Sequence, residues 1–277
     1  MVLLDVVRRL DGVRLIVVHV NHGIRKDATE DAKLVQTYAM SHNLTYEQTE
    51  LSLGNGASEE VSRNARYEFL RHISKKYNAQ AILTAHHKDD LLETAIINLL
   101  RGTGWRGLSS LRSTGDIIRP LLQTPKSELQ AYAVEHDIPW RYDSTNDNTS
   151  YLRNYVRHNV VPKTDNENLE KLYQYIVRQN ELTDTIDDET AHWLETNISL
   201  ADESALLPRY PFIMMPHHVA HELLQAVLRR VSGKSMTRPL ADRALLFTKV
   251  AKAHKTFPIN ADWQLRALLG EMIVERR

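Results

Sequence analysis

The sequence contains no cysteine, and this absence removes three kinds of chemistry at once. Without a thiol there is no disulfide, no thiolate zinc site and no cysteine nucleophile. Long apolar runs are also lacking, because none approaches the ~18 residues that a membrane-spanning helix needs, and no signal-peptide pattern opens the chain. These absences suit a reducing compartment, so we expect a cytoplasmic protein with no membrane partner.

An excess of charge of either sign is lacking too, because 35 Lys and Arg residues balance 35 Asp and Glu residues. The balance hides an asymmetry along the chain. Residues 1–162 carry net +1, residues 163–203 carry 3 basic against 11 acidic side chains, and residues 204–277 carry 12 basic against 5 acidic ones. This asymmetry is typical of a protein with a polyanion-facing surface, although an acidic solvated helix followed by an ordinary basic domain explains it equally well.

Segments typical of strands and helices alternate in the first 160 residues. The predicted strands are residues 13–20, 45–51 and 79–85, and the predicted helices are residues 27–42, 58–78 and 89–100. Strands that alternate with helices indicate βαβ units, so we predict an α/β fold with a doubly wound, mostly parallel sheet. In such sheets, ligands bind at the carboxyl ends of the strands.

Beyond Pro162 the apolar spacing is helical throughout, as in the stripe from Val219 to Val231 that ends at Gly233. We therefore predict a domain boundary near residues 161–163. The chain then consists of an α/β domain of residues 1–162, an acidic helical linker of residues 163–203, and a smaller, basic, mainly helical domain of residues 204–277.

The segment with the most chemistry follows the third predicted strand. It carries two imidazoles, His86 and His87, and three carboxylates, Asp89, Asp90 and Glu93. Because Asp90 and Glu93 are three residues apart, they share one face of a helix near its N-terminus. Such a group can bind a divalent metal, perform acid–base catalysis or hold a cationic substrate. The structural alternative is that Asp89 caps the helix and that the other two carboxylates favour the helix dipole.

Two further segments can bind anions. Residues 101–107 hold three glycines and two arginines, which permit a ligand to approach the backbone and phosphates to be gripped, although a plain tight loop fits equally well. Arg153 and Arg157 are four residues apart and share one helical face, which suits phosphates but is also common on a solvated face.

Five motifs stand in a characteristic order in this sequence. They are Val18-His19-Val20-Asn21-His22-Gly23-Ile24-Arg25, His86-His87-x-Asp89-Asp90-x-x-Glu93-Thr94, Arg101-Gly102-x-Gly104-x-x-Gly107-Leu108, Arg119-Pro120-Leu121 and Asp143-Ser144-x-Asn146-x-x-x-x-Tyr151-x-Arg153-Asn154-x-x-Arg157. Together they closely resemble the bacterial tRNA(Ile)-lysidine synthases, a family of N-type ATP pyrophosphatases. The resemblance is specific over residues 1–162 and loose over residues 163–277. It implies a Rossmann-like catalytic domain followed by a helical, tRNA-facing one.

Members of that family adenylate the C2 carbonyl of the wobble cytidine in an isoleucine tRNA. The amine of free lysine then displaces AMP, which gives lysidine. The resemblance therefore implies a ligase that forms a carbon–nitrogen bond, uses ATP and Mg²⁺, and has tRNA(Ile) with a CAU anticodon and free L-lysine as its partners. It also admits a homodimer.

The motifs carry residue roles with them. The resemblance assigns lysine recognition and attack to Asp90, Glu93 and His86, and it places Arg66 in the same pocket. The residues implied to surround the nucleotide are Asn21, His22, Arg101 and Gly102, and those implied to lie near phosphates of ATP or tRNA are Arg153, Asn154 and Arg157. A carboxylate pair suits cationic lysine, whose amine must lose a proton to a carboxylate or to His86 before it attacks. No metal ligand is assigned among these residues.

One motif of the family is missing from residues 1–277. The family's phosphate loop, Ser-Gly-Gly-x-Asp-Ser, precedes its first helix and carries a magnesium-binding aspartate, whereas residues 1–7 resemble the helix that follows this loop. Either a segment precedes Met1 or the chain is truncated. A polypeptide that begins at Met1 should be nearly inactive, because nothing else here offers a helix N-terminus to pyrophosphate. The chain also ends earlier than many family members, which carry a further small domain.

Two other functions stay open. The His-His-x-Asp-Asp cluster can ligate manganese or magnesium in a metal-dependent phosphohydrolase, which leaves the other motifs unexplained. A non-catalytic tRNA-binding module follows if the phosphate loop is truly absent, and its affinity should fall steeply with salt. Its candidate contacts are Arg229, Arg230, Lys249, Lys252 and Lys255.

Overall fold

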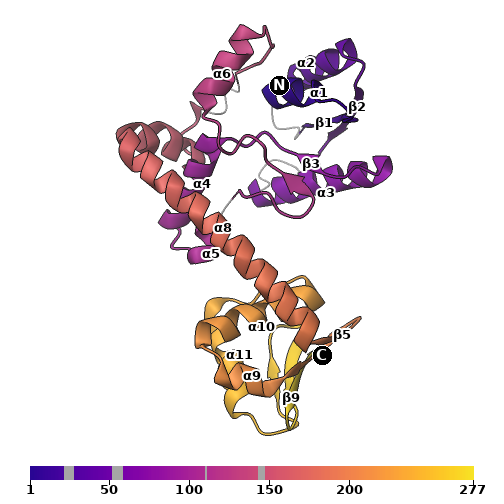
Figure 1. The fold of residues 1–277 in the computed structure, drawn as a ribbon, viewed down its shortest axis with the longest axis vertical. Coiled ribbons are helices and arrows are strands. Elements are labelled where there is room, and N and C mark those ends of the chain that lie inside the picture. Colours follow the sequence, from indigo (N-terminus) through magenta and orange to yellow (C-terminus); the bar gives the residue numbers. More distant parts are fainter. Residues whose placement is uncertain (22–27, 52–58, 110, 143–146) are drawn as a thin grey trace. The chain divides into compact units, whose positions relative to one another are not determined.

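The computed structural model describes residues 1–21, 28–51, 59–109, 111–142 and 147–277 (Figure 1). By their internal contacts they form two compact units, Met1–Asn180 and Glu181–Arg277. The long helix α8 (Asn166–Asn197) contributes residues to both units. The division of the chain at residues 162 and 203 stays a prediction. No helix in the described ranges is long and apolar enough to span a membrane.

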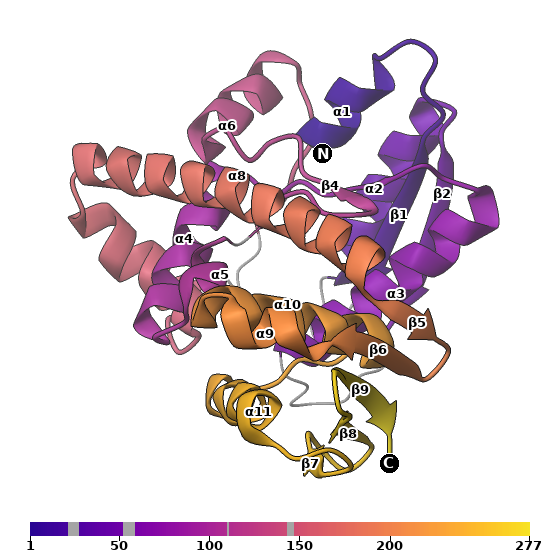
Figure 2. The same cartoon turned by 60° about the horizontal axis from the view of Figure 1, so that its bottom comes forward.

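The strand pairs that the structure describes in the first unit are parallel. β1 (Ile16–Asn21) pairs with β2 (Thr45–Glu50), and β3 (Ile82–Leu83) pairs with β4 (Ile117–Ile118). A parallel pair needs a crossover connection, and α2 (Ala28–Ser41) lies in the connection between β1 and β2, beside that pair in Figure 2. The predicted α/β fold with parallel strands is therefore confirmed.

The three helices of the first unit for which a range was predicted agree closely with it. Besides α2, the helices of this unit are α1 (Val2–Arg8), α3 (Glu59–Tyr77), α4 (Lys88–Leu100), α5 (Trp105–Leu108), α6 (Lys126–Glu135) and α7 (Leu152–Tyr155), and a π-helix (Val156–Val160) and a 3-10 turn (Val161–Lys163) lead from α7 towards α8. Helices α2, α3 and α4 begin and end within one residue of the predictions. The third strand is shorter than the predicted residues 79–85, because the hydrogen bonds to β4 extend only from Ile82 to Thr84.

The first unit is held together around α4. Its apolar side packs Leu91, Leu92 and Ala95 against Tyr173 and Ile176 of α8. This packing buries one face of α4 and leaves its N-terminal polar residues at the carboxyl end of β3. The helix is therefore anchored at the point where an α/β sheet binds its ligands.

A buried carboxylate ties together three helices of the same unit. The side chain of Asp5 on α1 is 1% exposed and accepts hydrogen bonds from the hydroxyl groups of Tyr38 on α2 at 2.6 Å and Tyr132 on α6 at 2.9 Å. It also accepts one from Arg8 at 2.5 Å. Burial alone raises the pKa of this carboxyl, but the three donors outweigh burial and hold the pKa at about 2.

The second unit contains a five-stranded antiparallel sheet of order β5-β6-β9-β8-β7. Its strands are β5 (Ser199–Ala201), β6 (Ser204–Pro208), β7 (Thr256–Pro258), β8 (Trp263–Ala267) and β9 (Glu271–Arg276), and its further helices are α9 (Arg209–Met214), α10 (His217–Ser232) and α11 (Arg238–Val250). One sheet face is apolar and the other carries polar contacts, such as the pair Arg266–Glu275 at 2.7 Å.

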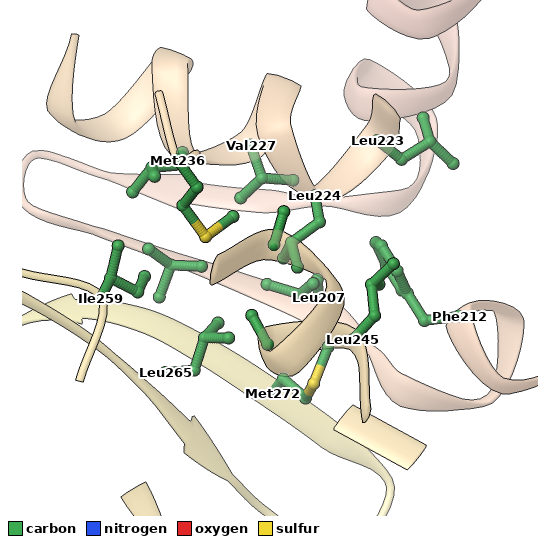
Figure 3. Close-up of a cluster of buried hydrophobic side chains, with 14 of the residues drawn as sticks. Leu207, Phe212, Leu223, Leu224, Val227, Met236, Leu245, Ile259, Leu265 and Met272 are labelled. Carbon is green, nitrogen blue, oxygen red and sulfur yellow. The ribbon is translucent and has the colours of Figure 1, made fainter. Parts of the chain in front are cut away.

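The apolar face of this sheet and the helices share one core (Figure 3). Leu207, Leu265 and Met272 from the strands meet Leu224 and Leu245 from α10 and α11, and all five side chains are fully buried. Burial of each such side chain contributes ~1.5–3 kcal/mol, so this unit has a substantial core of its own.

The second unit confirms one expectation and corrects another. α10 ends at Gly233, whose φ of +68° is the left-handed conformation that glycine adopts most easily, as predicted. The expectation that the pattern beyond Pro162 is wholly helical was wrong. The strands span three to six residues, and an alternation such as Trp263, Leu265 and Ala267 is too short to stand out beside two long helical stripes.

Candidate active site

A cavity of about 340 Å³ lies where β3 ends and α4 begins. Its lining comes from α3 (Arg66, Tyr67 and Leu70), from the residues after β3 (Thr84, Ala85 and His86), from α4 (Asp90) and from α7 (Arg153). The cavity therefore lies at the carboxyl end of a parallel strand, as expected for the ligand site of an α/β fold. Four of the predicted site residues line it together: Arg66, His86, Asp90 and Arg153.

The N-terminus of α4 is capped by His87 and not by Asp89. The N-cap residue is His87, and the Asp90 carboxylate accepts a hydrogen bond from the His87 backbone N–H at 3.1 Å, which forms a capping box. The prediction that Asp89 caps the helix was wrong, because the Asp89 carboxylate accepts from the Lys126 backbone N–H at 2.8 Å. His87, 3.5 Å away, and this N–H hold the pKa of Asp89 at about 2.

Glu93 is buried, at 2% exposure, and it holds two arginines. Arg157 donates from Nε at 2.6 Å and from Nη2 at 2.9 Å, and Arg153 donates from Nε at 3.1 Å. The Asp90 carboxylate lies 3.7 Å from Arg157 Nη2 and 4.0 Å from Arg153 Nη2. The hydrogen bonds to Glu93 raise the pKa of Arg157. Arg153 and Arg157 thus form a cluster with two carboxylates instead of a solvated helical face.

His86 is half-buried beside Asp90, and its Nδ1 lies 2.9 Å from the Thr84 hydroxyl. Burial lowers the pKa of the imidazole to about 4, because the charged form loses its hydration. Asp90 opposes this shift, whereas the positive charges of Arg119, Arg153 and Arg63 add to it. His86 is therefore neutral at pH 7.

The four residues predicted to surround the nucleotide are not brought together in the cavity by the described part of the structure. Asn21 ends β1, and its carbonyl accepts a hydrogen bond from Leu51 N–H at 2.7 Å. Arg101 is the C-cap of α4, and Gly102 has a φ of +67°, which favours glycine. Of the described residues, Asn21, Arg101 and Gly102 do not line the cavity. His22 lies outside the described residues.

The last motif is partly described. Its residues Asp143, Ser144 and Asn146 lie outside the described residues. Asn154 is buried and donates from Nδ2 to the Asn148 carbonyl at 2.9 Å, so it supports the turn before α7. A role for Asn154 near phosphates stays a prediction.

Sequence reasoning missed four residues of the cavity wall, of which Tyr67 and Thr84 are the polar ones. Tyr67 directly follows Arg66, but a tyrosine in the apolar stripe of a helix is usually a core residue, and Tyr67 is indeed buried. Thr84 stands two residues before His86, within a predicted strand. Its position two residues before His86 was the only hint in the sequence that Thr84 belongs to the site. Spacing alone does not reveal that the Thr84 hydroxyl forms a hydrogen bond with His86.

The carboxylates of Asp89, Asp90 and Glu93 accept hydrogen bonds from backbone N–H groups or from arginine side chains. Within the described ranges, no group of three or more histidine, aspartate or glutamate side chains has the arrangement of a metal site. Glu93 faces guanidinium groups and Asp89 faces a backbone N–H. This arrangement of the described residues gives no support to the metal-dependent phosphohydrolase.

Comparison with protein families and curated proteins agrees with the motifs. Residues 1–164 match the family model of the PP-loop domain. The chain is 30% identical over 249 residues to the tRNA(Ile)-lysidine synthase of Thermotoga maritima, which covers 84% of this chain and 59% of that protein. It is 41% identical over 150 residues to the enzyme of that name from Thermosipho africanus, which covers 52% of this chain and 35% of that protein. The chain therefore spans less than two thirds of the length of these curated relatives. The resemblance inferred from the motifs is confirmed.

A solved structure also matches in fold. The U34-tRNA thiolase NcsA from Methanococcus maripaludis with its [4Fe-4S] cluster aligns with a TM-score of 0.52 and 18% sequence identity. The alignment covers 65% of this chain and 66% of that one. At this identity the likeness shows the fold alone.

Proposed function

Because the chain belongs to the PP-loop domain family, we propose that it is an ATP-dependent ligase that forms lysidine in tRNA(Ile) with a CAU anticodon. In the first step, the C2 carbonyl oxygen of the wobble cytidine attacks the α-phosphorus of ATP, and pyrophosphate leaves. In the second step, the amine of free L-lysine attacks C2, the C2–O bond breaks, and AMP leaves. The observation that carries the proposal is the cavity in which Arg66, His86, Asp90 and Arg153 meet.

Asp90 is our candidate for binding the lysine substrate. It is the carboxylate in the lining of the cavity, and a carboxylate is the side chain that best holds an ammonium group. Glu93 lies one helical turn further along α4, where it already accepts hydrogen bonds from two arginines. We therefore propose that Asp90 contacts lysine directly, and that Glu93 supports this contact by keeping Arg153 and Arg157 in place.

His86 can assist the second step because it is neutral. A protonated imidazole beside Asp90 would repel the lysine ammonium, whereas burial keeps the pKa of His86 at about 4. The attacking amine must lose a proton, and the nearby groups that can accept it are the Asp90 carboxylate and the His86 imidazole, of which His86 is a weak base because its pKa is about 4. The hydrogen bond between Thr84 and His86 Nδ1 leaves Nε2 as the nitrogen that can face the substrate.

The phosphate-facing roles follow from charge. Arg66 and Arg153 bring two guanidinium groups to the cavity that holds Asp90, and guanidinium groups bind phosphate oxygens well. We propose that these arginines, with Arg157, lie near phosphates of ATP or tRNA. The proposal also gives a role at the nucleotide to four residues, Asn21, His22, Arg101 and Gly102. It further includes Mg²⁺ as a cofactor, a cytoplasmic location and a homodimer. No step is assigned to Mg²⁺.

The proposal is tested by supplying full-length protein with ATP, radiolabelled lysine and transcribed tRNA(Ile) with a CAU anticodon. We expect AMP and pyrophosphate to be released and lysine to enter the RNA in equal amounts. A transcript with uridine in place of the wobble cytidine is the matched control and should accept no lysine. Failure of the CAU transcript to yield AMP would show that the proposal is wrong.

The assignment of Asp90 has its own test in the Asp90→Asn variant. The loss of one charge-assisted hydrogen bond costs ~1.5–3 kcal/mol, so the KM for lysine should rise roughly 10–100-fold. Lysine-independent adenylation, measured by exchange of labelled pyrophosphate into ATP, should change much less. Asp89→Asn is the control, because Asp89 is on the same helix but bonds to Lys126. Equal loss of lysine use and adenylation in Asp90→Asn would refute the assignment.

A further inference from the structure

A second cavity, of about 650 Å³, lies along α3 and shares Tyr67 with the candidate active site. We call it the α3 hollow. The side chains that matter for its charge are four basic residues (Arg63, Arg71, Lys75 and Arg119) and one acidic residue (Glu68). The hollow is therefore strongly cationic, in a chain whose total formal charge is zero.

The cations of the α3 hollow are largely not neutralised within the protein. Arg71 pairs with Asp116 at 3.0 Å. Among the described residues, no carboxylate forms an ion pair with Arg63, Lys75 or Arg119. Closely spaced like charges repel one another, and a bound anion relieves this repulsion.

Arg119 lines the hollow from within the protein, because it is only 6% exposed and its position is fixed by its surroundings. Its Nη1 donates to the Arg112 carbonyl and its Nη2 lies 3.4 Å from the Tyr67 hydroxyl. Its Nε is buried and has no hydrogen-bond partner in the part of the chain that the structure describes. A buried donor without a partner is destabilising, so an acceptor supplied by a ligand would relieve this cost.

Tyr67 organises two of the exposed arginines. The guanidinium carbons of Arg63 and Arg71 lie 5.4 Å and 6.0 Å from the centre of the Tyr67 ring. These cation–π contacts favour defined positions for two long side chains. Their planar groups are therefore partly ordered before a ligand arrives.

The extent of the hollow indicates what kind of anion it suits. Arg63 and Lys75 are twelve residues apart on one helix, so their positions are separated by ~18 Å along the helix axis. A single phosphate or pyrophosphate is much shorter than this distance. A nucleic-acid strand presents successive phosphates over such a length, and the exposed positions of Arg63 and Lys75 leave room for it.

We propose that the α3 hollow binds backbone phosphates of the RNA strand that carries the reacting nucleotide, while the base of that nucleotide enters the cavity with Asp90. Tyr67, which lines both cavities, then separates the phosphate-binding part from the base-binding part. The inference rests on the proposed function, because it needs an RNA substrate. It adds Arg63, Lys75 and Arg119 to the residues that position this substrate.

The test measures the binding of a fluorescein-labelled anticodon stem-loop RNA to full-length protein by anisotropy over a range of KCl concentrations. Each phosphate contact to a single strand contributes ~0.7 to the slope of log K against log salt. The double variant Arg63→Gln/Lys75→Gln should therefore reduce this slope by ~1.4. The matched control is Arg14→Gln/Lys33→Gln, which removes the same charge from exposed side chains outside the hollow. The control should leave the slope unchanged.

The outcomes separate this inference from the proposed function. Equal slopes for both double variants and the unmodified protein, with lysidine still formed, would overturn the α3 hollow as an RNA site and leave the proposed function intact. A reduced slope only in the hollow variant, without AMP release by the unmodified protein, would support the RNA site and reject the proposed activity.

A calorimetric titration with pyrophosphate distinguishes the other source of phosphate groups. If Arg63→Gln/Lys75→Gln weakens pyrophosphate binding and leaves the RNA slope unchanged, the occupant is a free anion, and the inference is overturned. If the variant lowers the RNA slope and leaves pyrophosphate binding unchanged, the RNA backbone is the occupant.

Discussion

Replacing Glu93 by glutamine removes the charge that holds Arg153 and Arg157 beside the candidate active site. The carboxylate is 2% exposed and accepts hydrogen bonds at 2.6, 2.9 and 3.1 Å. Glutamine has nearly the same volume but only one acceptor oxygen, and its amide would face a guanidinium donor. The variant therefore changes charge and hydrogen bonding while the packing of α4 stays almost the same.

The expected cost follows from burial. Removal of one partner of a buried ion pair costs ~3–5 kcal/mol. The side chains of Arg153 and Arg157 are 30% and 23% exposed, so water can replace part of the lost interaction. We therefore expect Glu93→Gln to lower the free energy of unfolding by ~2–3 kcal/mol. For a unit of this size, the melting temperature should fall by roughly 5–10 °C.

A double-mutant cycle isolates the interaction between Glu93 and Arg157. The variants are Glu93→Gln, Arg157→Gln and their combination, and the free energy of unfolding is measured by urea denaturation followed by circular dichroism. We expect a coupling energy of ~1.5–3 kcal/mol, because the two side chains share two hydrogen bonds.

The surface pair Arg141–Glu30, at 2.5 Å, is the matched control for this cycle. Both side chains are exposed, so Glu30→Gln should cost at most ~1 kcal/mol. The reasoning is refuted if Glu93→Gln costs no more than Glu30→Gln, or if the coupling between Glu93 and Arg157 is below ~0.5 kcal/mol.

Two further predictions concern stability. The pKa of Asp5 is held at about 2 in the folded chain, against ~3.9 in the unfolded chain. At a pH above the unfolded pKa, the ionised carboxylate therefore contributes ~2.5 kcal/mol to the free energy of unfolding, and this contribution is lost as the pH falls towards 2. Acid titration of the unfolding free energy should show a shallower decline in Asp5→Asn, and identical pH profiles would contradict the role of Asp5. Leu207→Ala should destabilise the second unit by ~2–5 kcal/mol, because Leu207 is fully buried in its core. Calorimetry should show this loss, whereas truncation of the exposed Leu269 should change little.

Local features of the sequence were sufficient to predict much of the α/β part. Helices α2, α3 and α4 were located to within one residue, because each combines an apolar stripe with clear signals at its ends. The spacing of His86, Asp90 and Glu93 also placed these residues correctly around the start of α4. The five strands of the second unit were missed, since short strands depend on pairing with distant partners more than on their own sequence.

The partners of each charged group, by contrast, were decided by the tertiary structure. The spacing of Asp90 and Glu93 suggests two equivalent carboxylates, but the fold brings Arg157, 64 residues away in sequence, to Glu93 and leaves Asp90 in the lining of the cavity. In the same way Asp89 is engaged by the backbone of Lys126, and Tyr67 lines both the candidate active site and the α3 hollow, which no motif reveals. Helical periodicity is a property of neighbouring residues, and the sequence by itself determines it. Burial and electrostatic pairing depend on which distant segments meet, and only the folded chain decides that.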